Sequence, residues 1–177
     1  MSQQIVPAGG GTSTGVGGGL AVQKGSRALA ETESHDYVSI VIAGQMFGIP
    51  VLQVQDVLGA QRITRIPLAP PEVAGSLNLR GRIVTAIDLR TRLHLPKRTD
   101  GGESMSVVVD QGGESYSLLV DNVGEVLSLS AATLERNPAT LASAWREVSV
   151  GIHRLDGSLL ILLDVARLLD FAKVDAA

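Results

Sequence analysis

The residues of this chain that could carry out chemistry are few and lie far apart. Its three histidines are His35, His94 and His153, and none lies at metal-ligand spacing from another histidine or from a pair of carboxylates. The chain has no cysteine, which excludes disulfides, thiolate metal sites and cysteine nucleophiles. It also lacks the Gly-x-Ser-x-Gly motif of a serine hydrolase. We therefore expect no catalytic activity, no metal and no cofactor.

Two aspartates, Asp88 and Asp164, are the remaining candidates for acid–base chemistry. Each directly precedes a short helical pattern, Leu89 to Leu93 in one case and Val165 to Phe171 in the other. Aspartate is a preferred residue at a helix N-terminus, so capping is the favoured interpretation. The alternative is a carboxylate pair in a ligand-binding or hydrolytic pocket, and raised pKa values in such a pocket would support it.

The N-terminal segment is rich in glycine, serine and threonine. Its composition cannot bury enough apolar surface to offset the entropy of ordering, and we expect a disordered tail over residues 1–34. A phosphate-binding loop is the alternative for this segment. It fails on spacing, because Gln23 precedes Lys24 where such a loop needs glycine, and no strand leads into it.

Composition limits the class of protein further. The chain has 177 residues, enough for one domain, and its residues are 45% hydrophobic but only 3% aromatic, which predicts an aliphatic core. A net charge of −3 without a clustered basic face gives no basis for nucleic-acid binding. No apolar run approaches the roughly 20 residues of a membrane helix, and no signal peptide is evident, so we expect a cytoplasmic protein without membrane insertion.

The elements that must position any binding residues are mostly short strands. In the stretch from Gly75 to Asp88, alternating leucines predict a strand, Arg80 and Gly81 predict a tight turn, and β-branched residues predict the return strand. The three- and four-residue spacing of apolar side chains between Val51 and Leu58 predicts one or two helical turns. Further strands are predicted at Tyr37–Ala43, Met46–Ile49, Ser104–Asp110, Tyr116–Val120, Val148–Leu155 and Leu159–Leu163.

The two halves of the chain resemble each other. A shift of 69 places Phe47 on Tyr116 and Val54 on Val123, and a shift of 76 places Gly75 on Gly151 and Asp88 on Asp164. The sequence therefore predicts two copies of one small β unit, over residues 44–95 and 112–171. Each copy has about five strands, which suggests two small barrels that share a core and exchange strands.

A binding module is what remains once enzymatic sites are excluded. Val54, with Asp56 nearby and Arg80 at a hairpin tip, would form an apolar contact bordered by one charge of each sign, as in protein interfaces. Small barrels also present edge strands to which partners can bind.

Several ordered motifs resemble those of the CheW family of chemotaxis coupling proteins. The runs Phe47–Val57 and Gly75–Val84, the latter followed by Ile87, Asp88 and Leu89, are similar to the family's two signatures in the first half. The runs Asp121–Leu127 and Gly151–Asp164 are similar to the second half. The resemblance covers Asp36 to Phe171 and leaves out only the N-terminal tail and the last residues. It implies a CheW-like domain over residues 35–174, built from two five-stranded SH3-like β-barrel subdomains with short helices and a C-terminal helix.

The resemblance also implies partners and contact residues. CheW-like proteins have no catalytic activity and link transmembrane chemoreceptors, at the receptors' cytoplasmic tips, to the histidine kinase CheA in membrane-associated arrays. By motif, Val54 and Asp56 match the kinase-facing surface, and Asp56 keeps the charge of the glutamate that the family often has there. The positions matching receptor and array contacts are Gly75, Arg80, Val123 and Val126. Two alternatives stay open, namely a scaffold in a non-flagellar pathway such as surface motility and a small-molecule-binding barrel.

Overall fold

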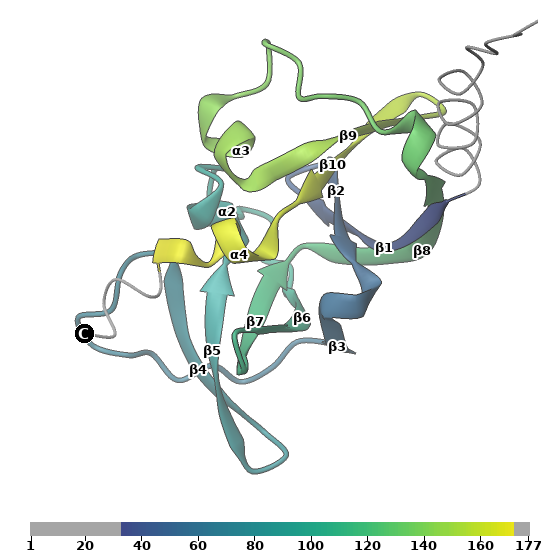
Figure 1. Ribbon diagram of the computed structural model, residues 1–177. Helices are drawn as coiled ribbons and strands as arrows, with labels where there is room; N and C mark the ends of the chain where they lie inside the picture. The colour runs from purple at the N-terminus through teal and green to yellow at the C-terminus, as the bar shows by residue number, and fades with distance from the viewer. Residues whose placement is uncertain (1–32, 172–177) are drawn as a thin grey trace, which may run out of the picture.

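The computed structural model describes residues 33–171, which form two five-stranded sheets joined by short helical turns (Figure 1). This confirms the predicted mainly β fold, while the predicted tail lies outside the described residues except for Glu33 and Ser34. The first sheet comprises, in spatial order, β8 (Asn122–Ser130), β1 (Ser34–Ile42), β2 (Gln45–Pro50), β10 (Ser158–Leu163) and β9 (Ser149–Leu155). The second comprises β3 (Val54–Leu58), β6 (Met105–Gln111), β7 (Glu114–Val120), β5 (Arg82–Asp88) and β4 (Val73–Leu79). The helical segments are η1 (Val51–Gln53), α2 (Leu89–Arg92), η2 (Ala131–Thr133), α3 (Ser143–Val148) and α4 (Val165–Leu168).

The internal repeat is visible in the strand pairing. Ile40 pairs with Phe47 in the first half, and Val109 pairs with Tyr116 at the same shift of 69 residues in the second. Replacing each strand β1 to β5 by the strand five places later, and the reverse, converts the order of one sheet into that of the other. The two sheets are therefore built on one plan.

Neither sheet is made from a contiguous half of the chain. Strand β2 of the first half pairs in parallel with β10 of the second, and β7 of the second half pairs in parallel with β5 of the first. The ranges 44–95 and 112–171 thus each contribute strands to both sheets. In each parallel pair, a strand from one half of the chain lies in a sheet beside a strand from the other half. This pairing joins the two halves into one structure.

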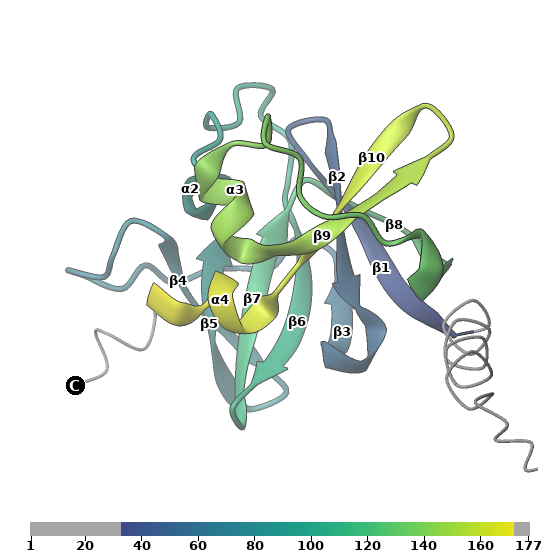
Figure 2. The same cartoon turned by 45° about the horizontal axis from the view of Figure 1, so that its top comes forward.

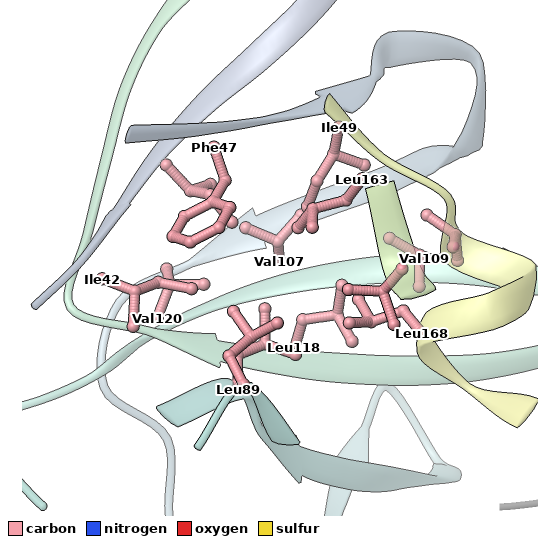
Figure 3. Packing of buried hydrophobic residues seen from close by; sticks show 14 of the residues in the cluster. Ile42, Phe47, Ile49, Leu89, Val107, Val109, Leu118, Val120, Leu163 and Leu168 are labelled. Atoms are coloured by element: carbon pink, nitrogen blue, oxygen red, sulfur yellow. The ribbon is translucent and has the colours of Figure 1, made fainter. Parts of the chain in front are cut away.

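One aliphatic core is shared by both sheets. Figure 3 shows side chains from β2, β6, β7, α2 and α4 converging, among them Phe47, Val107, Leu118 and Leu168, and all four are fully buried. A smaller cluster of Leu77, Val84 and Ala86 lies on the other face of the second sheet, because successive strand residues point to opposite faces. Full burial of one such aliphatic side chain contributes about 1.5–3 kcal/mol, so the shared core is the main stabilising feature.

The two repeat-related aspartates are helix caps. Asp88 Oδ1 accepts a hydrogen bond from the backbone N–H of Arg90 at 3.0 Å, and its Oδ2 accepts one from the Thr91 hydroxyl at 2.9 Å. Asp164 Oδ1 accepts from the backbone N–H of Arg167 at 3.3 Å. The capping interpretation is confirmed, and both carboxylates are occupied by the helices that they begin.

One predicted element is wrong. The segment from Val51 to Leu58 was expected to be helical, but only the single turn η1 is, and the chain then extends as β3. Val54 pairs with Val109 and Asp56 with Val108 in an antiparallel ladder. The β-branched side chains of this segment suit a strand, and without β3 the backbone groups along one side of β6 would be unpaired. Pairing with β6 therefore overrides the helical spacing of the apolar residues.

His153 is buried on β9, where its repeat counterpart in the first half is Leu77. Its Nδ1 lies 3.2 Å from the Thr133 hydroxyl. Burial lowers the pKa of the imidazole, and the nearby charge of Glu135 offsets this only in part. The folded protein therefore holds His153 in its neutral form more strongly than the unfolded chain does.

We expect the free energy of unfolding to fall as the pH is lowered below about 6.5, because the unfolded chain then binds a proton that folded His153 resists. His153→Leu, which restores the residue of the other repeat, should flatten this dependence. Urea midpoints of the wild type and of His153→Leu, measured from pH 8 to pH 5, test the prediction. An unchanged slope in His153→Leu would rule out His153 as the titrating group.

Candidate functional site

The β4–β5 hairpin presents Arg80 to solvent. The two turn residues, Arg80 and Gly81, have φ angles of 52° and 83°, and the Asn78 side chain accepts a hydrogen bond from the N–H of Gly81 at 2.9 Å. Both positions of such a turn favour glycine or asparagine, so an arginine at the first of them is held in a disfavoured conformation. Backbone strain at an exposed cation is the kind of feature that accompanies a functional contact.

Asp56 meets Arg80 across the open side of the second sheet. Its Oδ2 lies 3.2 Å from Nη2 of Arg80, and its Oδ1 accepts the N–H of Val57 at 2.9 Å. The Asp56 side chain is 27% exposed and the Arg80 side chain 82% exposed. A pair this exposed contributes at most about 1 kcal/mol to stability, so a partner can compete for either group. Asp56, which the family resemblance assigned to the kinase-facing surface, thus lies beside Arg80, which it assigned to receptor and array contacts.

A small hollow of about 150 Å³ adjoins this pair. Gln55 and Ser115 form its polar side, with the Ser115 hydroxyl donating to Oε1 of Gln55 at 3.0 Å. The remaining lining residues are Leu79, Arg82, Val84 and Val108. The hollow, Asp56 and Arg80 together form what we call the hairpin surface. It carries both charge signs and an apolar floor, which suits a protein contact.

The other predicted residues of the first half are placed differently. Val54 is half-buried and packs against the shared core. Gly75 is buried in β4, and a Cβ there would lie 2.2 Å from the carbonyl oxygen of Thr64. Val57, which was not among the predicted contact residues, pairs with Val107 and is 40% exposed on edge strand β3. Gly75 therefore shapes the hairpin from inside, and Val57 is the apolar side chain that this edge strand exposes.

Strand β8 forms an edge of the first sheet and carries the remaining predicted residues. Val123 is half-buried against the shared core, whereas Val126, opposite Val38 of β1, is 60% exposed. Under the shift of 69 residues, Val126 is the counterpart of Val57 on β3. The two repeats thus expose one valine each on related edge strands. The alignment of the two halves already matched Val57 with Val126, so it could have identified Val57 as a candidate contact residue.

A largely buried ion pair elsewhere has a structural role. Arg90 of α2 donates from Nε to Oδ1 of Asp121 at 2.9 Å, and Asp121 Oδ2 accepts the backbone N–H of Ala43 at 2.8 Å. The hydrogen bonds from Arg90 hold the pKa of Asp121 below its usual range. The pair ties α2 to the β1–β2 turn and so connects the two sheets.

Residues 33–171 contain no group of three or more histidine or acidic side chains that could hold a metal ion. Within the same range, no helix is long and apolar enough to cross a membrane. Neither Asp88 nor Asp164 lines the hairpin surface, and both are engaged as caps.

Two sheets of common plan, exposed edge strands and a charged hairpin define a β-sheet scaffold whose exposed groups suit contacts with other proteins. The sequence matches the model of the CheW-like domain over residues 36–173. This chain belongs to the CheW-like family, whose members are non-enzymatic scaffold or adaptor proteins of chemotaxis.

Relatives from distant bacteria support the same assignment. The chemotaxis protein CheW of Klebsiella aerogenes is 31% identical over 144 residues, which cover 81% of this chain and 87% of that protein. CheW of Treponema pallidum is 27% identical over 140 residues, covering 77% and 82% of the two chains. The crystal structure of the scaffolding protein TtCheW from Thermoanaerobacter tengcongensis superposes with a TM-score of 0.71 at 28% identity, covering 78% of this chain and 94% of that one.

Proposed function

We propose that this protein is the adaptor that couples transmembrane chemoreceptors to a CheA-type histidine kinase in chemotaxis arrays. The observation that carries the proposal is the hairpin surface within a chain of this family, where Arg80 is strained, exposed and paired only weakly. An arginine held in this conformation costs stability, and its exposed pair with Asp56 returns little of that cost. The mixed charges and apolar lining of the hairpin surface suit a protein that acts by joining others.

The predicted contacts divide between two surfaces. Asp56 and the strand that carries it, with half-buried Val54 and exposed Val57, form the proposed kinase-facing side. Arg80 on its hairpin, positioned by Gly75, is the proposed receptor or array contact, together with Val126 on β8 and Val123 beneath it. Because Asp56 and Arg80 touch, we propose that binding at one of these surfaces affects the other through this ion pair.

Reconstitution tests the proposal. A CheA-type kinase, receptor-containing membranes and this protein should together give kinase autophosphorylation that responds to receptor ligand. Omitting this protein should remove the response while leaving the basal rate of the kinase in place. A kinase that responds equally well without this protein would contradict the proposal. A scaffold in surface motility would pass the same test with receptors of that pathway, so both receptor sets belong in the experiment.

A further inference from the structure

A hollow of about 480 Å³ opens between the start of β1, η1 and η2, and we call it the β1 hollow. Figure 2 shows the start of β1 next to the end of β8, at the side of the molecule away from α4. The walls of the β1 hollow are mainly apolar and include Leu52, which is fully exposed, and Leu134, which is 42% exposed. His153 of β9, only 2% exposed, also lines it. Apolar walls with a single nearly buried polar ring are typical of small-molecule sites of this volume.

The hydrogen bonds of Thr133 decide which ring nitrogen of His153 carries the proton. The Thr133 hydroxyl donates to the carbonyl oxygen of Ser130 at 2.9 Å, and the same hydroxyl oxygen lies 3.2 Å from Nδ1 of His153. A hydroxyl has one hydrogen to donate, so Thr133 can only accept from His153. From this network we assign the proton of neutral His153 to Nδ1, which leaves Nε2 as a hydrogen-bond acceptor.

This acceptor is unused within the part of the chain that the structure describes. Nε2 of His153 has no hydrogen-bonding partner among residues 33–171. A nearly buried acceptor has lost most of its contact with water, which costs free energy unless a donor replaces the water. Packing does not require a histidine here, because the repeat counterpart is the buried leucine Leu77. Since His153 lines the β1 hollow, a molecule bound there can supply the donor.

The other polar groups of the β1 hollow disfavour an anion. Asp36 lines the hollow, is exposed, and has no lysine or arginine partner among the described residues. His35, also in the lining, lies 3.5 Å from Glu33. Within the described chain, no lysine or arginine lines this hollow. A negatively charged ligand would therefore meet a carboxylate without a compensating cation, whereas a neutral or cationic donor would not.

Two aromatic rings in the lining point to the shape of the ligand. The ring centroids of Tyr37 and His153 lie 6.2 Å apart with the planes tilted by 52°, an arrangement that an aromatic guest can extend. We propose that the β1 hollow binds a compact aromatic molecule that carries an N–H donor and no negative charge. Its N–H donates to Nε2 of His153, and its rings pack against Tyr37, Leu52 and Leu134. The β1 hollow shares no lining residue with the hairpin surface, so this inference stands apart from the proposed coupling function.

Indole and benzofuran are the matched probes for this site. Benzofuran keeps the two fused rings of indole and has an oxygen in place of the N–H. NMR titrations of the full-length chain at pH 8, above the usual imidazole pKa of about 6.5, measure both dissociation constants with His153 neutral. Indole should bind about fivefold more tightly than benzofuran, the worth of one hydrogen bond, and should shift the ¹⁵N resonance of Nε2. Indole-3-acetate, which adds a carboxylate, should bind more weakly than indole.

Three variants locate the binding. His153→Leu removes the acceptor, so indole and benzofuran should bind this variant equally well. Leu52→Ser changes a fully exposed side chain and keeps the fold, and it should weaken both probes by a similar factor. Ile83→Ser, at an 81% exposed isoleucine on β5 outside the β1 hollow, is the control and should leave both dissociation constants unchanged.

The tautomer gives an independent test without any ligand. A long-range ¹H–¹⁵N spectrum at pH 8 should show His153 protonated on Nδ1, with its signals identified by their loss in His153→Leu. A proton on Nε2 would overturn the proposal, because the ring would then present a donor to the hollow. Equal binding of indole and benzofuran to the wild type, or an undiminished preference for indole in His153→Leu, would overturn it as well. So would binding that fails to saturate or that Leu52→Ser leaves unchanged.

Discussion

Arg80→Glu is expected to abolish most of the receptor-dependent control of the kinase while the protein stays folded. Charge reversal removes the exposed guanidinium, whose Nη2 lies 3.2 Å from Oδ2 of Asp56. It also places a second carboxylate beside that of Asp56. Lost contact and new repulsion at an interface together weaken binding by about tenfold or more. The reconstituted kinase assay, with circular dichroism to verify the fold, measures the effect.

Two further variants make this prediction specific. Arg80→Asn suits the turn better than arginine does, so it should preserve or increase stability and still reduce coupling. Arg154→Glu reverses an exposed arginine on the related β9–β10 hairpin, where it pairs with Glu135 at 2.9 Å, and it should leave coupling unchanged. Normal coupling by a folded Arg80→Glu protein would remove the hairpin surface as a contact site. Equal losses in Arg80→Glu and Arg154→Glu would mean that overall charge, not this surface, is responsible.

Gly75→Ala is expected to have the largest effect on stability. Its φ angle of 150° lies in a region that side chains disfavour, and the added Cβ would lie 2.2 Å from the Thr64 carbonyl oxygen and 2.8 Å from Cγ2 of Ile63. Relief requires the loop between β3 and β4 to separate from β4, breaking the two backbone hydrogen bonds between Thr64 and Ser76. Strain and overpacking together should cost roughly 3 kcal/mol or more, seen as a lower denaturation midpoint.

The matched control is Gly81→Ala. Gly81 also has a positive φ, 83°, but nothing lies within 4 Å of an added Cβ. This variant should cost only about 1–2 kcal/mol, the penalty of the left-handed conformation alone. The difference between the two variants measures the close approach of the loop. Equal costs would show that the loop gives way easily and that Gly75 has no special positioning role.

The structure assigns the same role to Gly151, the repeat counterpart of Gly75. Its φ angle is 156°, and a Cβ there would lie 2.6 Å from the Glu135 carbonyl oxygen. The backbone groups of Glu135 and Ile152 exchange hydrogen bonds of 2.9 Å, as those of Thr64 and Ser76 do. The glycine in each repeat therefore allows the preceding segment to cross its strand, a structural reason for the match that the sequence shows.

Local chemistry in the sequence determined the class of fold and its turns. Alternating apolar residues gave the strands around Leu77 and Leu118, and the turn at Arg80 and Gly81 lies where glycine indicated it. The aspartate before each short helical pattern determined both caps. These features depend on neighbours within a few residues, which is why periodicity and residue type were enough.

Only the tertiary structure decided which residues form a surface. A bulge at Gln55 places Val54 opposite Val109 and Val57 opposite Val107, yet Val54 packs against the shared core while Val57 is 40% exposed. Asp56 and Arg80 meet because the second sheet curves round to bring residues 24 positions apart within hydrogen-bonding distance. The parallel pairs that exchange strands between the halves join segments more than 100 residues apart in one case. No local pattern encodes these contacts, because they arise from burying one core that both sheets share.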